Sequence, residues 1–207
     1  MEILNLETRY KGAIRLPQSL IDELPNKTML ATTVQFIDFL PKIQSQLKPK
    51  EVYLFKSKHG LHPGQILGCD TFKVRDEIEA FLYIGDGLFH PKALLINQKP
   101  IYIYNPFSEK YSKLSSKEIN EYKIKKKVQL SQFHAADKIG IVISTKPGQN
   151  ALSKALEFKD RIKHQKDTFL FISNIIDLNE LENFPFIEAW VNTACPRIEL
   201  LHMDEIE

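Results

Sequence analysis

Cysteine is scarce in this sequence, with only Cys69 and Cys195, 126 positions apart, among 207 residues. No CxxC, CxxxCxxC or mixed histidine–cysteine zinc spacing occurs, so the sequence contains no complete metal-binding motif of its own. A disulfide between the two thiols is possible, but it would be unusual in a reducing cytosol. Two isolated thiols are most often buried small hydrophobic residues, and their surroundings decide whether they do more.

Long apolar runs and a strong charge bias are also missing. No apolar run approaches the roughly 20 residues that a membrane span needs, and the N-terminus lacks the basic-then-apolar layout of a secretory signal. A net charge of +2 is too small to argue for nucleic-acid binding. The composition, 43% hydrophobic and 26% charged, is that of an ordinary globular protein. We therefore expect a cytoplasmic protein without a membrane segment.

Short β-rich runs alternate with helical patterns from residue 28 onward. The sequence predicts strands over 28–33, 51–55, 80–85, 100–104, 139–144, 168–173 and 187–192. Apolar spacing predicts helices over 16–24, 36–47, 117–134, 149–164 and 177–184. Strands that alternate with helices in this way are typical of parallel sheets built from βαβ units. We expect an α/β fold of two similar small domains, each a parallel sheet flanked by helices.

Four segments follow from this reading. They are an N-terminal connection over 1–27, an α/β domain carrying Cys69 over 28–110, a Lys-rich connecting helix over 111–136, and an α/β domain carrying Cys195 over 137–207. The two domains look like distant repeats, because in each a strand ending in Thr or Ser leads through a Gln-containing loop into a helix. The lysines of 117–127 indicate either a solvated helix face or a docking surface.

The loop after the predicted strand 80–85 combines two glycines with polar residues. Gly85 and Gly87 flank Asp86 and would let the backbone approach a ligand closely. Pro91 suits the first turn of a helix, which places His90 near its N-cap. In open α/β sheets, ligands collect at the carboxyl ends of strands. A tight strand-to-helix turn without a ligand explains the same residues.

Two further loops follow strands in the second half. Residues 144–149, Ser-Thr-Lys-Pro-Gly-Gln, form a plausible anion-binding turn at a helix start, or an ordinary turn; they lack the spacing of a Walker loop. The loop 192–198 contains Cys195, Pro196 and Arg197. A Cys-Pro pair often accompanies iron–sulfur ligands, and an arginine can bind a substrate carboxylate. Cys69 similarly follows Pro-Gly and is flanked by Gly68.

The amino-acid sequences of these loops resemble the motifs of the diphthamide synthase family. The matching segments occur in the family's order and are Thr32-Thr-Val-Gln35, Pro63-Gly-Gln-Ile-Leu-Gly-Cys69, Ile84-Gly-Asp-Gly-Leu-Phe-His-Pro91, Ser144-Thr-Lys-Pro-Gly-Gln149 and Asn192-Thr-Ala-Cys-Pro-Arg-Ile198. The resemblance covers roughly residues 28–198. Asn105-Pro106 stands where the family usually has Asp-Pro, which is a mild departure.

The resemblance implies an enzyme of three similar α/β domains, each giving one cysteine to a 4Fe-4S cluster with one iron open for S-adenosylmethionine. Such enzymes cleave the bond from sulfur to the aminocarboxypropyl arm. They transfer that 3-amino-3-carboxypropyl group to a histidine of elongation factor 2, which is the first step of diphthamide biosynthesis. Family members form dimers, so a homo- or heterodimer is expected.

The motif match also implies roles for individual residues. Cys69 and Cys195 correspond to the cluster ligands of the second and third domains. The residues that would line the cofactor pocket are Gln35, Gly85, Asp86, Gly87, His90, Ser144, Lys146, Gly148, Gln149 and Arg197. Among these, Arg197 or Lys146 is expected to hold a carboxylate.

The chain departs from the family because a third cysteine and the first domain are missing. It could be half of a split enzyme whose partner chain supplies that domain and cysteine. It could instead be a non-catalytic accessory subunit without a complete cluster, or a fragment. A plain nucleotide-binding α/β domain is a further alternative.

Overall fold

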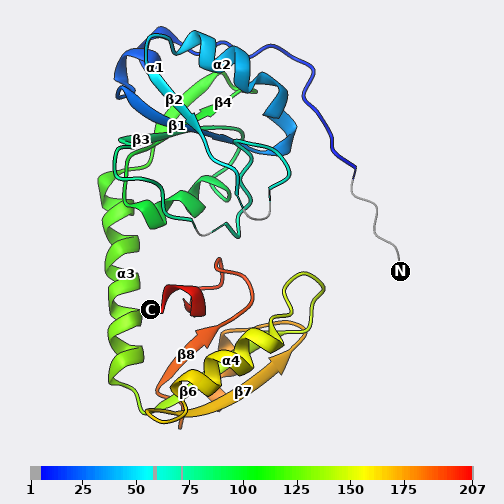
Figure 1. The fold of residues 1–207 in the computed structure, drawn as a ribbon, viewed down its shortest axis with the longest axis vertical. Helices are drawn as coiled ribbons and strands as arrows, with labels where there is room; N and C mark the ends of the chain where they lie inside the picture. The colour runs from blue at the N-terminus through cyan, green and yellow to red at the C-terminus, as the bar shows by residue number, and fades with distance from the viewer. Residues whose placement is uncertain (1–5, 58–59, 71, 207) are drawn as a thin grey trace. The chain divides into compact units, whose positions relative to one another are not determined.

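The computed structural model describes residues 6–57, 60–70 and 72–206 (Figure 1). The chain divides into two compact units, Met1–Tyr122 and Lys123–Glu207, and each contains one sheet. The first five residues of the predicted N-terminal connection, and Glu207, lie outside the described residues.

The first unit has a five-stranded sheet in the order β2-β1-β3-β4-β5. Its strands are β1 (Lys27–Thr32), β2 (Glu51–Leu54), β3 (Ala80–Ile84), β4 (Ile101–Asn105) and β5 (Lys110–Lys113). The first four are parallel, as predicted, but β5 runs antiparallel to β4. A tight turn makes this reversal, because Asn105 Oδ1 accepts the Phe107 amide at 2.8 Å and Glu109 takes a φ of 55°.

Helices cover both faces of this sheet. The helices α1 (Gln18–Glu23), η1 (Val34–Phe39) and α2 (Leu40–Gln46) lie on one face, packed on a core that includes Leu30 and Leu82 (Figure 1). The 3-10 helix η2 (Pro91–Asn97) and the start of α3 (Ser116–Ala135) pack on the opposite face. The helix predicted over 36–47 is divided into η1 and α2, because Pro41 begins an α-helix more readily than it continues one.

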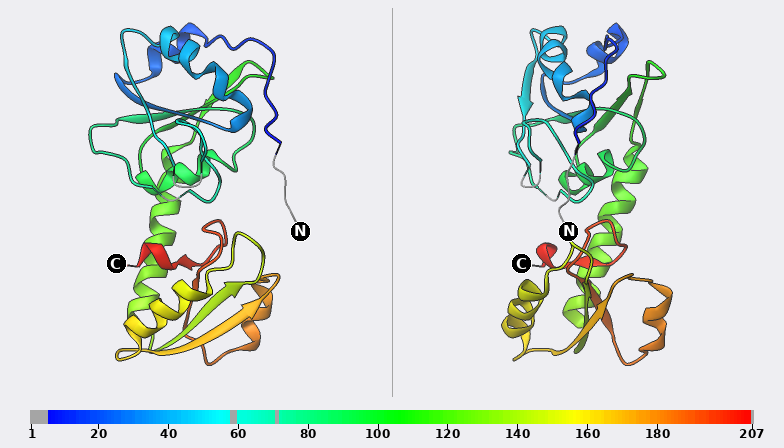
Figure 2. Two further views of the ribbon diagram at one scale, coloured as in Figure 1. Left: turned by 45° about the vertical axis from the view of Figure 1, so that its right-hand side comes forward. Right: turned by 90° about the vertical axis from the view of Figure 1, so that its right-hand side faces the viewer.

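The second unit has a four-stranded parallel sheet in the order β7-β6-β8-β9. Its elements are β6 (Lys138–Ser144), α4 (Leu152–Ile162), β7 (Asp167–Ser173), η3 (Asn179–Asn183), β8 (Ala189–Asn192), β9 (Leu201–His202) and η4 (Met203–Glu205). One face packs on α4 and the later turns of α3 through a buried core that includes Ile141 and Phe158. The right-hand view of Figure 2 shows α4 on one side of the sheet and the connection containing η3 on the other.

The face opposite α4 carries aromatic side chains that remain partly exposed. Phe169 and Phe171 of β7 and Trp190 of β8 pack with Phe184 and Phe186 of the β7–β8 connection. Phe169 is 38% exposed and Phe186 is 44% exposed. This group of five is called the aromatic face below.

Most of the expected elements are present. The seven predicted strands all form, each within two residues of the predicted bounds. The helix expected over 149–164 begins only at Leu152, and the one over 177–184 is the short 3-10 helix η3. In the described ranges of the chain, no helix is both long and apolar enough to cross a membrane.

Candidate functional site

The long β2–β3 connection crosses the carboxyl end of β1. The Thr32 amide donates to the Gly64 carbonyl, and the Ile66 amide donates to the Thr32 carbonyl, each at 2.8 Å. Gln65 therefore pairs with Thr32 as an isolated parallel bridge. Its buried side chain accepts the Leu61 amide at 2.9 Å. This pairing brings the Pro63–Cys69 motif to the edge of the sheet where ligands collect in parallel α/β folds.

Cys69 lies half-buried in a tight turn. The buried Asp70 carboxylate accepts the Leu67 amide at 2.7 Å, while the Asp70 amide donates to the Leu67 carbonyl at 3.1 Å. Gly68 packs directly on the ring of Phe89, because a Cβ at that position would lie 2.1 Å from the Phe89 ring. The Cys69 turn therefore lies against the loop after β3, so the structure brings two of the predicted motifs together.

The loop after β3 needs its glycines. Gly85 has a φ of +156°, and a Cβ there would lie 2.6 Å from the Tyr83 hydroxyl oxygen. Gly87 has a φ of +69° with open space around it. Asp86 is exposed, and its Oδ1 accepts the Gly87 amide at 2.8 Å and the Asn105 side-chain amide at 2.7 Å. Asp86 is thus held in the turn, as the turn-residue alternative expects.

Tyr83 is fully buried beneath this loop. Its hydroxyl has no hydrogen-bond partner among the described residues. Burial, and secondarily the Asp86 charge, raise the pKa of Tyr83 well above its usual value, so the phenol keeps its proton. The phenol is therefore a hydrogen-bond donor held at the loop.

His90 and Gln35 complete the predicted residues of the first unit. His90 occupies the N-cap of η2, as predicted, and burial lowers its pKa. Gln35 is half-buried in η1, and its carbonyl accepts the Tyr10 amide at 2.8 Å. His90 is thus biased toward the neutral imidazole.

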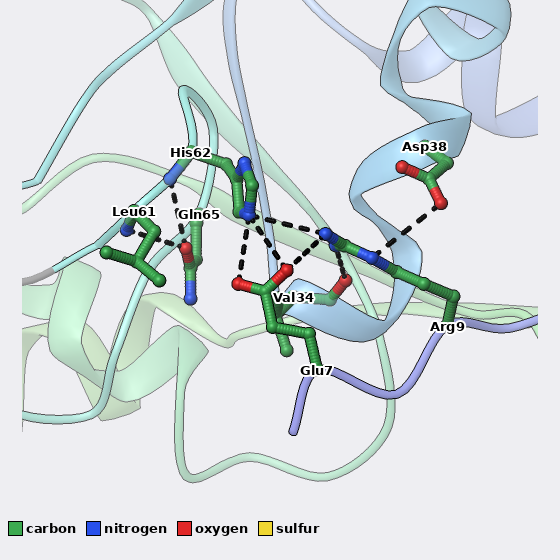
Figure 3. A network of polar contacts seen from close by, with 7 residues as sticks. All are labelled: Glu7, Arg9, Val34, Asp38, Leu61, His62 and Gln65. Carbon is green, nitrogen blue, oxygen red and sulfur yellow. Dashed lines mark hydrogen bonds and ion pairs between the residues drawn. The ribbon is translucent and has the colours of Figure 1, made fainter. Parts of the chain in front are cut away.

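A polar network fastens the N-terminal segment beside these loops (Figure 3). Arg9 donates to the Val34 carbonyl at 2.6 Å and to Glu7 at 2.5 Å. Glu7 in turn contacts the His62 ring at 3.0 Å, and the His62 amide donates to Gln65 at 3.1 Å. The network thereby joins the end of β1 to the β2–β3 connection from outside the sheet.

The loop after β6 lies at the carboxyl end of the second sheet. Ser144 is buried and its Oγ accepts the Lys146 amide at 3.1 Å. The Gln149 amide donates to the Lys146 carbonyl at 3.0 Å, and Gly148 takes a φ of +78°. Lys146, Gly148 and Gln149 are exposed. The turn stands three residues ahead of α4, so an anion bound there would not meet the helix N-terminus directly.

The loop after β8 carries Cys195 on the neighbouring strand. Thr193 donates its amide to the Val142 carbonyl at 3.1 Å, which ties the loop to β6. Cys195 is half-buried, and its carbonyl accepts the Ile198 amide at 2.9 Å in a tight turn. Arg197 is also half-buried, and its Nε has no partner among the described residues. Because β6 and β8 are adjacent, this loop and the Ser144–Gln149 loop share one edge of the sheet.

His202 was missed by the sequence reasoning. It lies on β9 opposite Asn192 and is 4% exposed. Its Nδ1 accepts the Asp204 amide at 3.2 Å. Burial lowers the pKa of His202, against the opposing pull of Asp204 and Glu205. No sequence motif indicates His202 as a site residue, because only the β8–β9 pairing brings it beside the Cys195 loop.

The predicted residues therefore form one group in each unit. Cys69, Gly85, Asp86, Gly87 and His90 share the edge of the first sheet, together with Gln35; Ser144, Lys146, Gly148, Gln149, Cys195 and Arg197 share that of the second. That the two thiols bind one centre stays a prediction. Among the residues that the structure describes, no group of three or more His, Cys, Asp or Glu side chains is placed to hold a metal ion.

Comparison with known proteins extends this picture. A family model for diphthamide synthesis proteins matches residues 12–205. The 2-(3-amino-3-carboxypropyl)histidine synthase of Pyrococcus horikoshii is 31% identical over 185 residues, which is 87% of this chain and 53% of the relative. Subunit 1 of the synthase from Schizosaccharomyces pombe is 30% identical over 196 residues, covering 88% of this chain and 44% of the relative. The chain thus spans about half the length of these relatives.

A solved structure shares the fold. The crystal structure of Dph2 from Pyrococcus horikoshii with a 4Fe-4S cluster matches at a TM-score of 0.71 and 29% identity. The match covers 91% of this chain and 58% of that one.

Proposed function

This chain belongs to the diphthamide synthesis protein family, and we propose that it is the part of a 2-(3-amino-3-carboxypropyl)histidine synthase that carries two cluster ligands. Its reaction would move the 3-amino-3-carboxypropyl group from S-adenosylmethionine to a histidine of elongation factor 2. The observation that carries the proposal is that each sheet presents one half-buried thiol at its carboxyl edge, in a chain similar to a protein solved with a 4Fe-4S cluster.

The surroundings of the thiols suit an anionic iron–sulfur group. Tyr83 in the first unit, and Asn192 and Arg197 in the second, hold buried polar atoms that have no partner among the described residues. Buried donors of this kind normally find an acceptor, so a missing acceptor is expected in each unit. Cysteine thiolates are the usual ligands of such clusters, and both thiols are half-buried. The residues present therefore fit part of a cluster site.

Two thiolates do not complete the ligand set of a cluster. Cluster iron is typically held by cysteine thiolates, and this sequence has two cysteines. We propose that a third thiolate comes from a domain that this sequence does not contain, on a partner chain or in a longer protein. A homo- or heterodimer would bring such a domain to the two edges.

The chain's own residues would divide the remaining work. Cys69 and Cys195, as thiolates, would ligate iron, and a bound cluster would supply the electron that breaks the carbon–sulfur bond of S-adenosylmethionine. Arg197 or Lys146 would bind the carboxylate of that cofactor, which suits a guanidinium whose Nε lacks a partner. Gln35, Asp86 and His90 would give polar contacts beside Cys69. Gly85, Gly87 and Gly148 would keep the loop backbones open to the ligand.

Anaerobic reconstitution tests this function. The full chain is incubated with iron and sulfide, alone and with a candidate first-domain protein that carries one cysteine. We expect a brown protein that binds S-adenosylmethionine and whose visible absorption is bleached by dithionite. Both properties should depend on Cys69 and on Cys195. Thr193→Val is the matched control, because it alters the Cys195 loop without touching a thiol.

An accessory subunit without a cluster is the second candidate, and the presence of only two cysteines favours it. It predicts no iron uptake with any partner, but stable association with a catalytic chain. A plain nucleotide-binding domain would instead bind the cofactor equally well in Cys69→Ala and Cys195→Ala variants.

A further inference from the structure

Two of the orphaned polar atoms in this chain flank one cysteine. Within the described ranges, four buried side-chain atoms lack a hydrogen-bond partner: Tyr83 Oη, Gln129 Oε1, Asn192 Nδ2 and Arg197 Nε. Asn192 lies three residues before Cys195 and Arg197 lies two residues after it. Both atoms are donors. A buried donor without an acceptor is costly, so a pair of them at one loop calls for a ligand that accepts.

The Asn192 carboxamide is held in one orientation. Its Oδ1 accepts the Ala194 amide at 3.0 Å, so a flipped side chain would set one N–H against another. The residue is 0% exposed and ends strand β8. His202 lies opposite Asn192 on β9, and its Nδ1 accepts the Asp204 amide at 3.2 Å. The hydrogen bond from the Ala194 amide fixes the peptide that leads into Cys195, and the Asn192 N–H group is fixed with it.

The hydrogen bond from the Ala194 amide accounts for the oxygen of this side chain but not for its nitrogen. An aspartate would accept the Ala194 amide equally well, and leucine would fill a similar volume without burying a polar nitrogen. The feature that asparagine adds at this position is the donor.

We propose that the side-chain N–H of Asn192 donates to a sulfur of the cluster held by Cys195. The inference rests on the proposed function and adds to it the acceptor that Asn192 serves. A hydrogen bond to a cluster sulfur withdraws negative charge and raises the reduction potential. Asn192 would thus make the cluster easier to reduce.

The test compares three variants of the full chain, reconstituted anaerobically with iron and sulfide in the presence of 2-mercaptoethanol to complete the ligand set. Asn192→Asp keeps an oxygen that accepts the Ala194 amide and removes the N–H donor. Asn192→Leu removes both groups without adding charge. Thr193→Val is the matched control, because Thr193 is also buried and hydrogen-bonded but donates to the Val142 carbonyl of β6. Circular dichroism checks that each variant folds.

Two readouts are expected to change together. At a fixed potential, both Asn192 variants should show about a tenfold lower ratio of reduced to oxidised cluster, equivalent to about 59 mV for one electron. The resonance Raman Fe–S bands of the wild type should shift in heavy water, and both Asn192 variants should lose that shift. Thr193→Val should behave as the wild type does in both measurements.

Other outcomes overturn the inference in distinguishable ways. If the wild type holds a cluster and both Asn192 variants match it, Asn192 serves no cluster sulfur, while the proposed function stands. If Thr193→Val changes the potential as much as the Asn192 variants do, the role is only structural. If the Asn192 variants keep the potential but bind S-adenosylmethionine more weakly, the acceptor is on the cofactor. If the wild type takes up no cluster under any condition, the inference and the proposed function both fail.

Discussion

The two units share a strand order but differ in how their sheets are covered. The order β2-β1-β3-β4 of the first unit is repeated as β7-β6-β8-β9 in the second. The first sheet has a buried core on each face, whereas the second has α4 on one face and the partly exposed aromatic face on the other. The shared order supports the idea of a repeat. The difference shows that one topology supports both a three-layer and a nearly two-layer unit.

The cysteines do not occupy equivalent connections. Cys69 lies between the second and third strands of its sheet, while Cys195 lies between the third and fourth strands of its own. The position that corresponds to the Cys195 loop in the first unit is the Gly85–His90 loop. A repeat can therefore place a thiol at the same edge of the sheet from two different loops, because all these loops leave the carboxyl ends of parallel strands.

The largest expected effect concerns these two thiols. Cys69→Ser and Cys195→Ser should each lower the amount of iron bound by the reconstituted protein by more than about tenfold. Losing a ligand should weaken metal binding more than losing a residue that hydrogen-bonds to a ligand, which typically costs about tenfold or more in metal affinity. Iron and sulfide analysis measures it, and thermal unfolding without iron provides the control. If one variant kept the full amount of iron, the two cysteines would not ligate the same cluster.

Truncating a phenylalanine in each unit would sharpen the difference in coverage. Phe81→Ala in the first unit should lower the free energy of unfolding by about 3–5 kcal/mol, because Phe81 is 0% exposed. Phe169→Ala in the second should cost only about 1 kcal/mol, since Phe169 is 38% exposed. Urea denaturation followed by circular dichroism measures both. Equal losses would indicate that the aromatic face is buried in solution.

Glycine substitutions give a third contrast. Gly85→Ala should cost about 3 kcal/mol, because its backbone is strained for any side chain and the new Cβ would meet Tyr83. Gly148→Ala, in the second unit, should cost about 1 kcal/mol, because only the positive φ penalises it. The difference is measured in the same denaturation assay. A Gly85 variant as stable as the Gly148 variant would show that Tyr83 can move away.

The smallest effect is on pH dependence. Burial lowers the pKa of His90 and His202, so in each unit the unfolded chain takes up the proton first as the pH falls below about 6.5. The contribution of these two histidines to the free energy of unfolding is therefore fully present above about pH 6.5, and it is lost as the pH falls toward their pKa values in the folded chain. The unfolding midpoint should therefore drop between pH 7 and 5. His202→Gln should flatten part of that drop, and an unchanged profile would contradict the burial.

Much of the fold could be predicted from the sequence, because buried parallel strands are short, continuous apolar runs. Strand β5 was missed, since Lys-Tyr-Ser-Lys has no apolar pattern and pairs only through the turn after Asn105. Tyr83, Asn192 and His202 were missed as site residues for a different reason. The importance of Tyr83 and His202 lies in an absent partner and a cross-strand neighbour, and neither leaves a local motif. Asn192 stands inside the 192–198 motif, but the motif does not show that its side-chain nitrogen lacks a partner.

The predicted Lys-rich helix shows the opposite case, where composition left two interpretations open. Lys125 pairs with Glu199, and Lys126 pairs with Glu205, each at 2.8 Å. The pairing lowers the pKa of Glu199. At least these two lysines have partners within the second unit, which favours the interpretation as an ordinary helix face for them. That distinction needs contacts some 74 residues apart in sequence, which spacing alone does not reveal.

The boundary between the units falls inside helix α3, and this has a practical consequence for dissecting the protein. Ile119 and Tyr122 pack on the first core, whereas Phe133 belongs to the second. Anyone expressing the halves separately must therefore cut a regular helix near Tyr122, leaving each product with a frayed end. A protease that prefers loops would find its sites elsewhere, so digestion should not yield the two units as clean products.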